Sequence, residues 1–475
     1  MKPFKLLIGG ELVAGASSQD VINPATGRPL AQSPRADEDQ LNSAVAAAKA
    51  AFPFWSGVQA AERAAKVSAL ADALESRKEE FATLLTQEQG KPLFLAGIEV
   101  AQSIGLLRTF ANMALDVEIL RENEEVRIVQ QRMPLGVVAA IIPWNFPLLL
   151  LMVKLAPALV AGNCVVAKPA PTTPLTTLRL GELCAGLLPP GVVNIIVDDN
   201  DLGSLLTRHP DVAKVAFTGS TPTGRRVMES AAPTLKRLTL ELGGNDAAIV
   251  LEDAPAKTVA AQIFMNAMLN SGQICMAIKR VYVHDSLYEQ VCEELARLAE
   301  AAIVDDGLAT GVQLGPLQNR AQFEKVSALI EDSRREGTLL SGGELPDRPG
   351  YFIRPTIVRD VADDARIVRE EQFGPVLPVL RYADIDDVVA RVNDCEFGLG
   401  ASVWGADLER AYDVALRLET GTVWINKHLE LPLDMPFRGA KQSGIGVEFG
   451  LEGLKEYTQA KVINMARGGL DHGVA

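Results

Sequence analysis

Residues 136–168, GVVAAIIPWNFPLLLLMVKLAPALVAGNCVVAK, carry the pattern that decides the fold. A β-branched run opens the stretch, a long apolar segment follows it, and a second β-branched run closes it. The apolar segment, 141–162, is interrupted by three prolines and carries Lys154 in its middle. A membrane-spanning helix needs about 20 consecutive, predominantly apolar residues. We therefore expect this segment to be buried core rather than a membrane span.

The same alternation continues along the chain. Short β-branched runs separated by helical stretches are typical of βαβ units and parallel sheets, so the predicted class is α/β. Residues 1–30 predict a short β-hairpin arm, with turns at Gly9-Gly10 and at 23–27. Residues 37–51 and 57–90 are rich in Ala, Leu and Glu and have a helical period. The β-branched runs are GVVAAII, NCVVAK, VVNIIV, KVAFTG, AAIVLE and KRVYVH.

The composition predicts a globular protein that binds small molecules. The chain has 475 residues, of which 48% are hydrophobic, which fits two or three domains with sizeable cores. Its 46 Lys and Arg against 60 Asp and Glu give a net charge of −14. This charge would repel nucleic acid and anionic membrane surfaces, so we expect neither as a partner.

The cysteines and the N-terminus predict a reducing, cytoplasmic compartment. The five cysteines are scattered and contain no CxxC pair, which indicates neither a disulfide framework nor a metal site. Residues 1–13 hold only a three-residue apolar run before two glycines, which is no signal-peptide core. The cysteines are Cys164, Cys184, Cys275, Cys292 and Cys395.

Cys275 lies in the stretch GQICMA (272–277), directly after a glycine and a glutamine. A free cysteine is most often buried and behaves as a small hydrophobe. A nucleophilic cysteine needs a lowered pKa or a base that takes its proton. The local sequence leaves both interpretations open.

Two further segments place polar groups in apolar surroundings. Asn145 lies in the proline-flanked aromatic turn 142–147, and Glu241 ends a strand before Gly243-Gly244. A buried amide or carboxylate must find partners, so a hydrogen bond that caps its own turn is one explanation for each. A catalytic set of thiol, carboxylate and amide donor is the other.

The turn after the strand 214–217 is a candidate phosphate site. We expect Thr221 to be the N-cap of the following helix and Pro222 its first residue. A helix N-terminus beside glycines offers N–H donors to a phosphate, but the spacing is not GxGxxG, so an ordinary capped turn is an equal alternative. Lys168 ends another strand and places a cation where a nucleotide ribose or phosphate could lie, although a lone lysine is usually solvated.

Eight motifs follow one another along the chain. They are PWNFP (143–147), KPAPTTP (168–174), FTGSTPTG (217–224), ELGGN (241–245), GQICMA (272–277), EEQFGPV (370–376), GTVWIN (421–426) and PFRGAKQSGIG (436–446). In this order they resemble the NAD(P)-dependent aldehyde dehydrogenase superfamily over most of the chain. The resemblance implies an aldehyde dehydrogenase-like fold, with a Rossmann-like NAD(P)-binding domain (1–112 and 135–241), a second α/β catalytic domain (242–455) and a small oligomerisation β-sheet (113–134 and 456–468).

The resemblance also implies roles for individual residues. Cys275 matches the catalytic nucleophile, Glu241 the general base and Asn145 the oxyanion donor, while Lys154 and Glu448 match a pair that relays protons. The matches to cofactor-binding positions are Trp144, Lys168, Gly219, Ser220, Gly224, Leu242, Glu371 and Phe373. The matches to the aldehyde tunnel are Leu149, Leu150, Val153, Leu269, Ile274, Met276, Leu429, Leu431 and Phe437. Together they imply oxidation of an aldehyde to the carboxylic acid through a thiohemiacetal and a thioester on the cysteine.

Four positions depart from the family pattern. Pro171 stands where a glutamate often grips the adenosine ribose, so we expect NAD to be used and NADP to be tolerated. Arg438 adds a cation near the catalytic mouth, in PFRG instead of the common PFGG. Met268 and Pro222 are expected to alter packing only.

The tunnel positions are nearly all aliphatic, which predicts apolar aliphatic or aromatic aldehydes as substrates. The alternative is a carboxylated substrate such as succinate semialdehyde, held by Lys427, His428 or Arg438. A CoA-acylating enzyme or a catalytically silent nucleotide-binding relative is less favoured, because the cysteine, glutamate and asparagine are all present. The run 457–465 predicts an edge strand, and with it a homo-oligomer, either dimer or tetramer.

Overall fold

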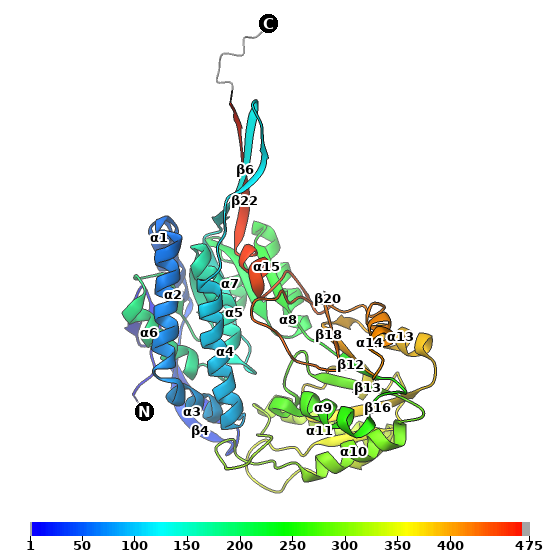
Figure 1. Ribbon diagram of the computed structural model, residues 1–475. Coiled ribbons are helices and arrows are strands. Elements are labelled where there is room, and N and C mark those ends of the chain that lie inside the picture. The colour runs from blue at the N-terminus through cyan, green and yellow to red at the C-terminus, as the bar shows by residue number, and fades with distance from the viewer. Residues whose placement is uncertain (1, 468–475) are drawn as a thin grey trace.

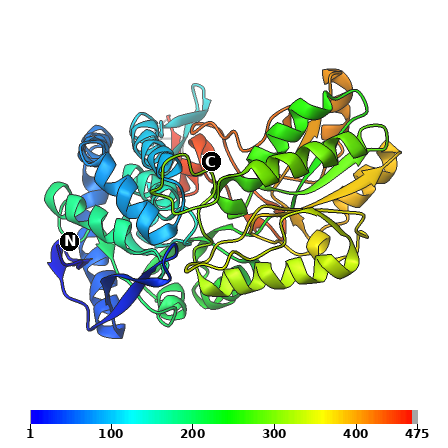
Figure 2. The same ribbon diagram turned by 90° about the horizontal axis from the view of Figure 1, so that it is seen from below.

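The chain folds into two α/β units and a small sheet that projects from them, as Figure 1 shows for a computed structural model of the protein. The structure describes residues 2–467. Seen from below, the two units lie side by side, with the blue and cyan elements in one and the yellow and orange elements in the other (Figure 2). The polar residues discussed below come from both units.

The sheet of the first unit has eight strands, and the five neighbouring strands from β9 to β11 run parallel to one another. This confirms the parallel sheet predicted from the alternating β-branched runs. In spatial order the strands are β2 (Glu11–Val13), β1 (Leu6–Ile8), β9 (Val193–Ile195), β8 (Cys164–Lys168), β7 (Val137–Ile141), β10 (Val212–Thr218), β11 (Arg237–Glu241) and β21 (Gly444–Ile445).

The first unit is completed by helices α1 (Glu38–Gly57), α2 (Ala60–Glu75), α3 (Lys78–Gln89), α4 (Leu93–Ala111), α5 (Pro147–Ala161), α6 (Leu175–Leu187), α7 (Gly203–Arg208) and α8 (Thr221–Ala231). The predicted helical regions 37–51 and 57–90 are confirmed. The first extends to Gly57, and the second is divided into two helices at Ser76-Arg77. The predicted N-terminal hairpins are also present, because β1 and β2 meet at Gly9-Gly10, and β3 (Ser17–Asn23) pairs with β4 (Arg28–Arg35).

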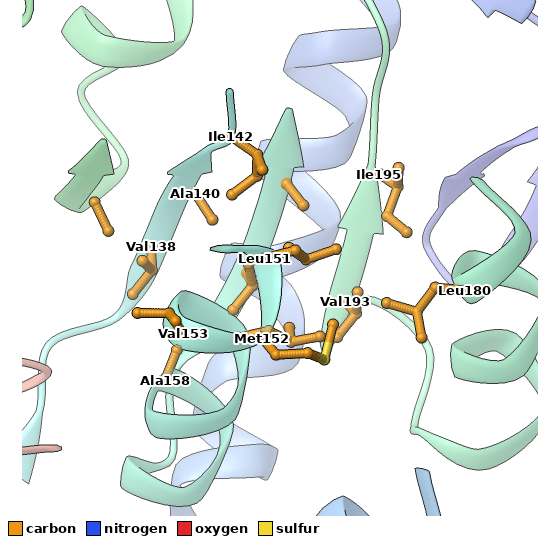
Figure 3. Close-up of a cluster of buried hydrophobic side chains, with 14 of the residues drawn as sticks. Val138, Ala140, Ile142, Leu151, Met152, Val153, Ala158, Leu180, Val193 and Ile195 are labelled. Carbon is orange, nitrogen blue, oxygen red and sulfur yellow. The ribbon is translucent and has the colours of Figure 1, made fainter. Parts of the chain in front are cut away.

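Helix α5 packs against the sheet of the first unit, and nearly all of its residues are buried. Figure 3 shows Leu151 and Met152 of this helix beside Val138 and Val193 of the sheet. Burying one such side chain contributes roughly 1.5–3 kcal/mol, so this contact is a large part of the core. The interpretation of 141–162 as buried core is therefore confirmed.

Helix α4 is long and apolar enough to cross a membrane by length and composition, with a mean hydropathy of 1.3. Half of this helix is buried, and it packs against α2, α3 and α5. It also buries the carboxylate of Glu99, which forms an ion pair with Lys91. These contacts are those of a core helix.

The second unit is built on a seven-stranded sheet, parallel except at one edge. Its strands in spatial order are β14 (Thr338–Ser341), β15 (Thr356–Arg359), β16 (Val376–Tyr382), β13 (Ile278–His284), β12 (Asp246–Val250), β18 (Gly400–Trp404) and β19 (Thr422–Ile425). Its helices are α9 (Ala256–Met268), α10 (Tyr288–Ala301), α11 (Arg320–Glu336), α12 (Arg366–Arg369), α13 (Ile385–Asn393) and α14 (Leu408–Ala415).

The chain then returns to the first unit. Strand β21 pairs with β11, so that Ile445 lies opposite Leu240, and helix α15 (Gly450–Lys455) contacts α5. Before it, β17 (Phe397–Gly398) and β20 (Ala440–Lys441) form a short two-stranded sheet. This return brings residue 448 next to the first unit.

The projecting sheet consists of β5 (Glu118–Glu122), β6 (Val126–Pro134) and β22 (Thr458–Ala466). Strand β22 pairs with β6 on one side, lies at the sheet's edge and is almost entirely exposed, so the edge strand predicted at 457–465 is confirmed. Residues 1 and 468, which the predicted domain ranges include, lie outside the described part of the chain.

Candidate active site

Cys275 lies at the junction of the two units, in a cavity of about 190 Å³. It belongs to the loop between a short 3₁₀ turn, η2 (Leu269–Gly272), and strand β13. Gly272 has a φ of +73°, and any side chain there would collide with the backbone of Gly374. The loop therefore needs this glycine. The cavity is lined by Pro143, Trp144, Asn145, Thr218, Gly219, Ser220, Glu241, Leu242, Gly243, Cys275, Gln322, Lys325, Glu371 and Phe373.

Lys279, near the start of β13, also holds this loop in place. Its ammonium group donates to the backbone carbonyls of Ile274, at 2.9 Å, and Cys275. Burial raises the pKa of the nearby thiol, and the charge of the buried Lys279 ammonium opposes part of this rise. Sequence reasoning missed this lysine, because nothing in the run KRVYVH shows that its first residue turns back toward the loop.

Glu241 ends strand β11 and faces the same cavity as Cys275. Its two carboxylate oxygens have no hydrogen-bond partner within residues 2–467. Burial raises the pKa of Glu241 well above its ordinary value, the charge of Glu448 adds to this shift, and Lys154 opposes it. A carboxyl group in this state is suited to accept a proton near neutral pH.

The surroundings of Cys275 favour the protonated form of its thiol. Burial, followed by the charge of Glu241, raises its pKa well above the ordinary value. Of the two routes to a nucleophilic cysteine, this direction of the pKa favours the one in which a base takes the proton. Glu241 is the carboxylate that lines the same cavity.

Asn145 is placed in this cavity by the turn that begins helix α5. Its side-chain amide donates to the backbone carbonyl of Gln273 at 3.0 Å, two residues before the cysteine. The Asn270 amide in turn donates to the Asn145 carbonyl at 3.3 Å. A primary amide has two N–H groups. The bond to the Gln273 carbonyl uses one of them and fixes the Asn145 side chain, and the other N–H is left for a ligand.

Lys154 and Glu448 form a buried ion pair. Their charged atoms lie 2.6 Å apart, and the Lys154 ammonium also donates to the Thr218 hydroxyl at 2.7 Å. The two residues are 294 positions apart, and they meet because the C-terminal segment returns to the first unit. Since both influence the pKa of Glu241, the pair lies within electrostatic reach of the base.

A second cavity, of about 920 Å³, adjoins the first and shares Trp144, Thr218, Gly219 and Ser220 with it. The N-terminus of α8 opens onto it. Ser220, in an extended conformation, is the N-cap and Thr221 the first helical residue, so the N-cap predicted at Thr221 is wrong by one position. The reason is that the chain enters the helix one residue early, with Pro222 in the second position.

This cavity fits a dinucleotide. Its volume suits one, and a helix N-terminus beside Gly219 offers N–H donors and a positive dipole end to a pyrophosphate. Gly224 lets α8 pack against Leu242, because any side chain at this glycine would collide with that leucine. Gly219 and Ser220 line this cavity, Leu242 lines the smaller one, and Gly224 lines neither.

Lys168 also lines the second cavity, which we call the cofactor cavity, but it is not a free cation. Its ammonium lies 2.6 Å from Asp198, whose other oxygen accepts the backbone N–H of Leu202. The Asp198 side chain is fully buried. Sequence reasoning missed Asp198, because it lies 30 residues from Lys168 and only the pairing of β8 with β9 brings them together.

Glu371 and Phe373 lie on the loop that faces the cysteine loop. One oxygen of Glu371 accepts the backbone N–H of Gly244 at 3.0 Å, and burial raises the pKa of this carboxyl. Phe373 has a φ of +53°, and its ring meets Trp144 edge to face at 5.4 Å. Both side chains thus line the passage between the two cavities.

The predicted tunnel residues divide into two groups. Leu149, Leu150, Val153, Met276, Leu431 and Phe437 belong to one apolar cluster together with Cys275. Leu269, Ile274 and Leu429 do not belong to this cluster, although Ile274 is adjacent to the cysteine and buried. This cluster is the hydrophobic core of the first unit, against which Cys275 is also packed.

Of the three residues that could hold a substrate carboxylate, two are not free cations. Burial lowers the pKa of His428 to about 3, so its ring is neutral. Its Nε2 lies 2.8 Å from the Met276 carbonyl. Lys427 forms an exposed ion pair with Glu430 at 3.1 Å. The side chain of Arg438 is exposed.

No group of His, Cys, Asp and Glu side chains within residues 2–467 is arranged to hold a metal ion. All five cysteines are free, as the predicted lack of a disulfide framework requires.

Comparison with known proteins gives matches over nearly the whole chain. The sequence model of the aldehyde dehydrogenase family matches residues 13–463. The chain is 41% identical to phenylacetaldehyde dehydrogenase of Pseudomonas fluorescens over 483 residues, covering 98% of this chain and 96% of the relative. It is 39% identical to geranial dehydrogenase of Castellaniella defragrans over 472 residues, covering 96% and 98%. A solved structure of aldehyde dehydrogenase from Bacillus cereus in complex with NAD+ is similar with a TM-score of 0.96, at 37% identity and with 98% and 97% coverage.

Proposed function

Since the chain belongs to the aldehyde dehydrogenase family and oxidises an aldehyde to the carboxylic acid with NAD, we propose that Cys275, Glu241 and Asn145 carry out this reaction. The observation that supports the proposal most directly is their convergence in one cavity from separate elements. The carboxylate of Glu241, whose oxygens have no hydrogen-bond partner in the described part of the chain, lines the same cavity as the thiol of Cys275.

In the first half-reaction, Glu241 takes the thiol proton as the sulfur of Cys275 attacks the aldehyde carbon. The carbonyl oxygen becomes an oxyanion, held by the Asn145 amide and the Cys275 backbone N–H. One such donor lowers the barrier by roughly 3 kcal/mol. NAD, when bound, accepts the hydride that leaves the thiohemiacetal carbon. The product of this step is a thioester on Cys275.

Before the second half-reaction, the proton taken from the thiol leaves Glu241, so that the carboxylate is free again. Glu241 then takes a proton from a water molecule, whose oxygen attacks the thioester carbon. The carbon–sulfur bond breaks, and the carboxylic acid is released from Cys275. The proton on Glu241 then has to leave the cavity. Lys154 and Glu448 form an ion pair whose charges influence the pKa of Glu241, and we assign this pair to the relay that carries the proton away.

The cofactor residues belong to the proposal as well. The N-terminus of α8, with Gly219 and Ser220, would hold the pyrophosphate, and Lys168 the adenosine ribose. Trp144, Glu371 and Phe373 would hold the nicotinamide end beside the cysteine. We propose that NAD is preferred to NADP, because Asp198 already neutralises Lys168 and leaves less attraction for a 2′-phosphate.

The substrate is an apolar aliphatic or aromatic aldehyde. The largely aliphatic residues at the predicted tunnel positions support this choice, as do the phenylacetaldehyde and geranial named for two relatives. Each buried CH₂ of the substrate would contribute roughly 0.8 kcal/mol. The neutral His428 and the paired Lys427 disfavour a carboxylated substrate.

The test is a panel of aldehydes that differ in chain length and charge, with formation of reduced nicotinamide as the readout. We expect kcat/KM for hexanal and benzaldehyde to exceed that for succinate semialdehyde. Arg438→Ala should change kcat/KM for hexanal by no more than about twofold, since exposed substitutions are usually within 0.5 kcal/mol. A preference for succinate semialdehyde that Arg438→Ala removes would make Arg438 the carboxylate anchor and the apolar assignment wrong.

Assembly and location also belong to the proposal. The projecting sheet exposes Ile119, Leu120, Val462, Ile463 and Met465, and an unpaired strand edge of this kind favours pairing with another chain. We propose that 113–134 and 456–468 join subunits of a homo-oligomer, while 1–112 with 135–241 and 242–455 form its cofactor and catalytic domains. The five free cysteines support a reducing, cytoplasmic location.

A further inference from the structure

A buried ion pair lies against the turn that carries Asn145. It consists of Lys91, which precedes α4, and Glu99 of that helix, and both side chains are fully buried. The ammonium and the carboxylate are in direct contact. Neither residue lines the two cavities described above.

Each member of the pair binds one side of the turn. The Lys91 ammonium donates to the backbone carbonyl of Asn145 at 2.8 Å and lies 3.5 Å from the centre of the Phe146 ring. One oxygen of Glu99 accepts the backbone N–H groups of Leu148 at 3.0 Å and Leu149 at 3.2 Å. These two N–H groups belong to the first turn of α5, where the backbone N–H groups have no acceptor within the helix. The pair therefore spans the turn from residue 145 to residue 149, and we call it the Lys91–Glu99 clasp.

Stability alone is a weak reason to keep such a pair. Removing two charges from water is costly, and replacing a buried ion pair by apolar side chains is often neutral or stabilising. The first turn of a helix can be satisfied by a single Ser, Thr or Asp cap, without a second charge. In this protein the second charge is directed at the carbonyl of Asn145.

We propose that the Lys91–Glu99 clasp is a positioning device for the Asn145 amide. The backbone of Asn145 is held by Lys91 and Asn270, while its side chain is held by the carbonyl of Gln273. With the backbone fixed on one side and the amide on the other, the remaining N–H has one direction available. A displacement of about 1 Å in such a donor can lower the rate by about a hundredfold.

This inference rests on the proposed role of Asn145, and the test separates the two. Lys91→Met with Glu99→Met removes both charges at once, so that neither is left buried alone. We expect this double variant to fold, to bind NAD with unchanged affinity in a fluorescence titration, and to keep its KM for NAD. Its kcat is expected to fall by about tenfold or more, up to the 10²–10³-fold loss typical of removing one oxyanion donor.

The same double substitution in the Asn145→Ala background shows whether the clasp acts through Asn145. We expect no further loss of kcat there, because the positioned group is already absent. An equal loss in both backgrounds, or a double variant with the wild-type kcat, would overturn the proposal. Asn145→Ala with the wild-type kcat would instead overturn the oxyanion role and the clasp's function with it.

Glu88→Gln is the matched control. Glu88 is also fully buried, and it accepts the backbone N–H groups of Leu175 at 2.7 Å and Thr176 at 2.9 Å at the start of α6. It caps a helix as Glu99 does but is not in contact with the Asn145 turn. We expect a lower Tm and an unchanged kcat for this variant. A kcat loss equal to that of the double variant would mean that the clasp is merely a helix cap.

A milder variant keeps the proposal testable if the double variant does not fold. Glu99→Gln retains an acceptor for Leu148 and Leu149 but loses the charge that holds Lys91. We expect a smaller loss of kcat in the same direction, with the KM for NAD unchanged. Full activity of this variant, with a lowered Tm, would show a purely structural role.

Discussion

The two cavities that meet at Trp144 differ in how their charged groups are satisfied. In the larger, cofactor cavity, Lys168 is paired with Asp198 at 2.6 Å. In the smaller cavity, the carboxylate oxygens of Glu241 have no partner in the described chain, and the pKa of Cys275 is raised. A group that only binds can have its charge neutralised permanently, whereas a group that exchanges protons must be left free to change its charge.

The largest loss of activity is expected from substitution of the nucleophile in the smaller cavity. Cys275→Ala should abolish dehydrogenase activity, because no covalent adduct can form. The affinity for NAD, measured by fluorescence titration, should remain, since the cofactor cavity is not changed. Turnover of this variant at the wild-type rate would show that Cys275 is not the nucleophile.

Substitution of the base should be severe but partial. Glu241→Gln is expected to release up to one equivalent of reduced cofactor per site more slowly than the wild type, because the thiol has lost its base, and then to stall as a thioester, because hydrolysis also needs the base. A loss of about 10²–10⁴-fold in the steady-state rate is typical for a missing base. Stopped-flow absorbance and intact-protein mass spectrometry would detect the burst and the acyl adduct. In the wild type, the rate should fall as pH drops through the raised pKa of Glu241, because the base becomes protonated.

The smallest effect is expected in the cofactor cavity. Asp198→Asn removes the charge that neutralises Lys168 and should raise kcat/KM for NADP relative to NAD by about tenfold, or ~1.4 kcal/mol. Binding of the two cofactors, measured by calorimetry, should shift in the same direction, while kcat with NAD stays near the wild-type value. An unchanged ratio would show that Asp198 does not control the choice of cofactor.

The sequence was sufficient to predict the sheet and the reactive residues, but not the partners of the buried charged groups. The β-branched runs predicted the parallel sheet, because a buried strand needs such residues wherever it lies, and the ordered motifs indicated Cys275, Glu241 and Asn145. The partners of these residues were not predictable. Asp198 and the Lys91–Glu99 clasp carry no local pattern, and their contacts join positions 30 and 54 residues apart. A buried charge is identified only when packing shows what faces it.

The predicted N-cap at Thr221 failed for a related reason. Ser220 and Thr221 are both good caps by residue type, and the one that starts the helix is decided by contacts with distant chain. Here the Thr221 hydroxyl donates to the carbonyl of Gln442, which is 221 residues away. Local propensity thus located the turn, and the tertiary structure fixed its first residue.

The return of the C-terminal segment to the first unit has a consequence for synthesis. Glu448 meets Lys154 across 294 residues, and β21 joins the sheet only after the second unit has been made. Because domains begin to fold while the ribosome is still adding residues, the first unit can form early, but without its last strand and without the partner of Lys154. A nascent chain would therefore hold a folded cofactor cavity long before it held a complete reaction cavity. Contacts this distant also slow the final step of folding, so the enzyme becomes active only once nearly all of its chain has emerged.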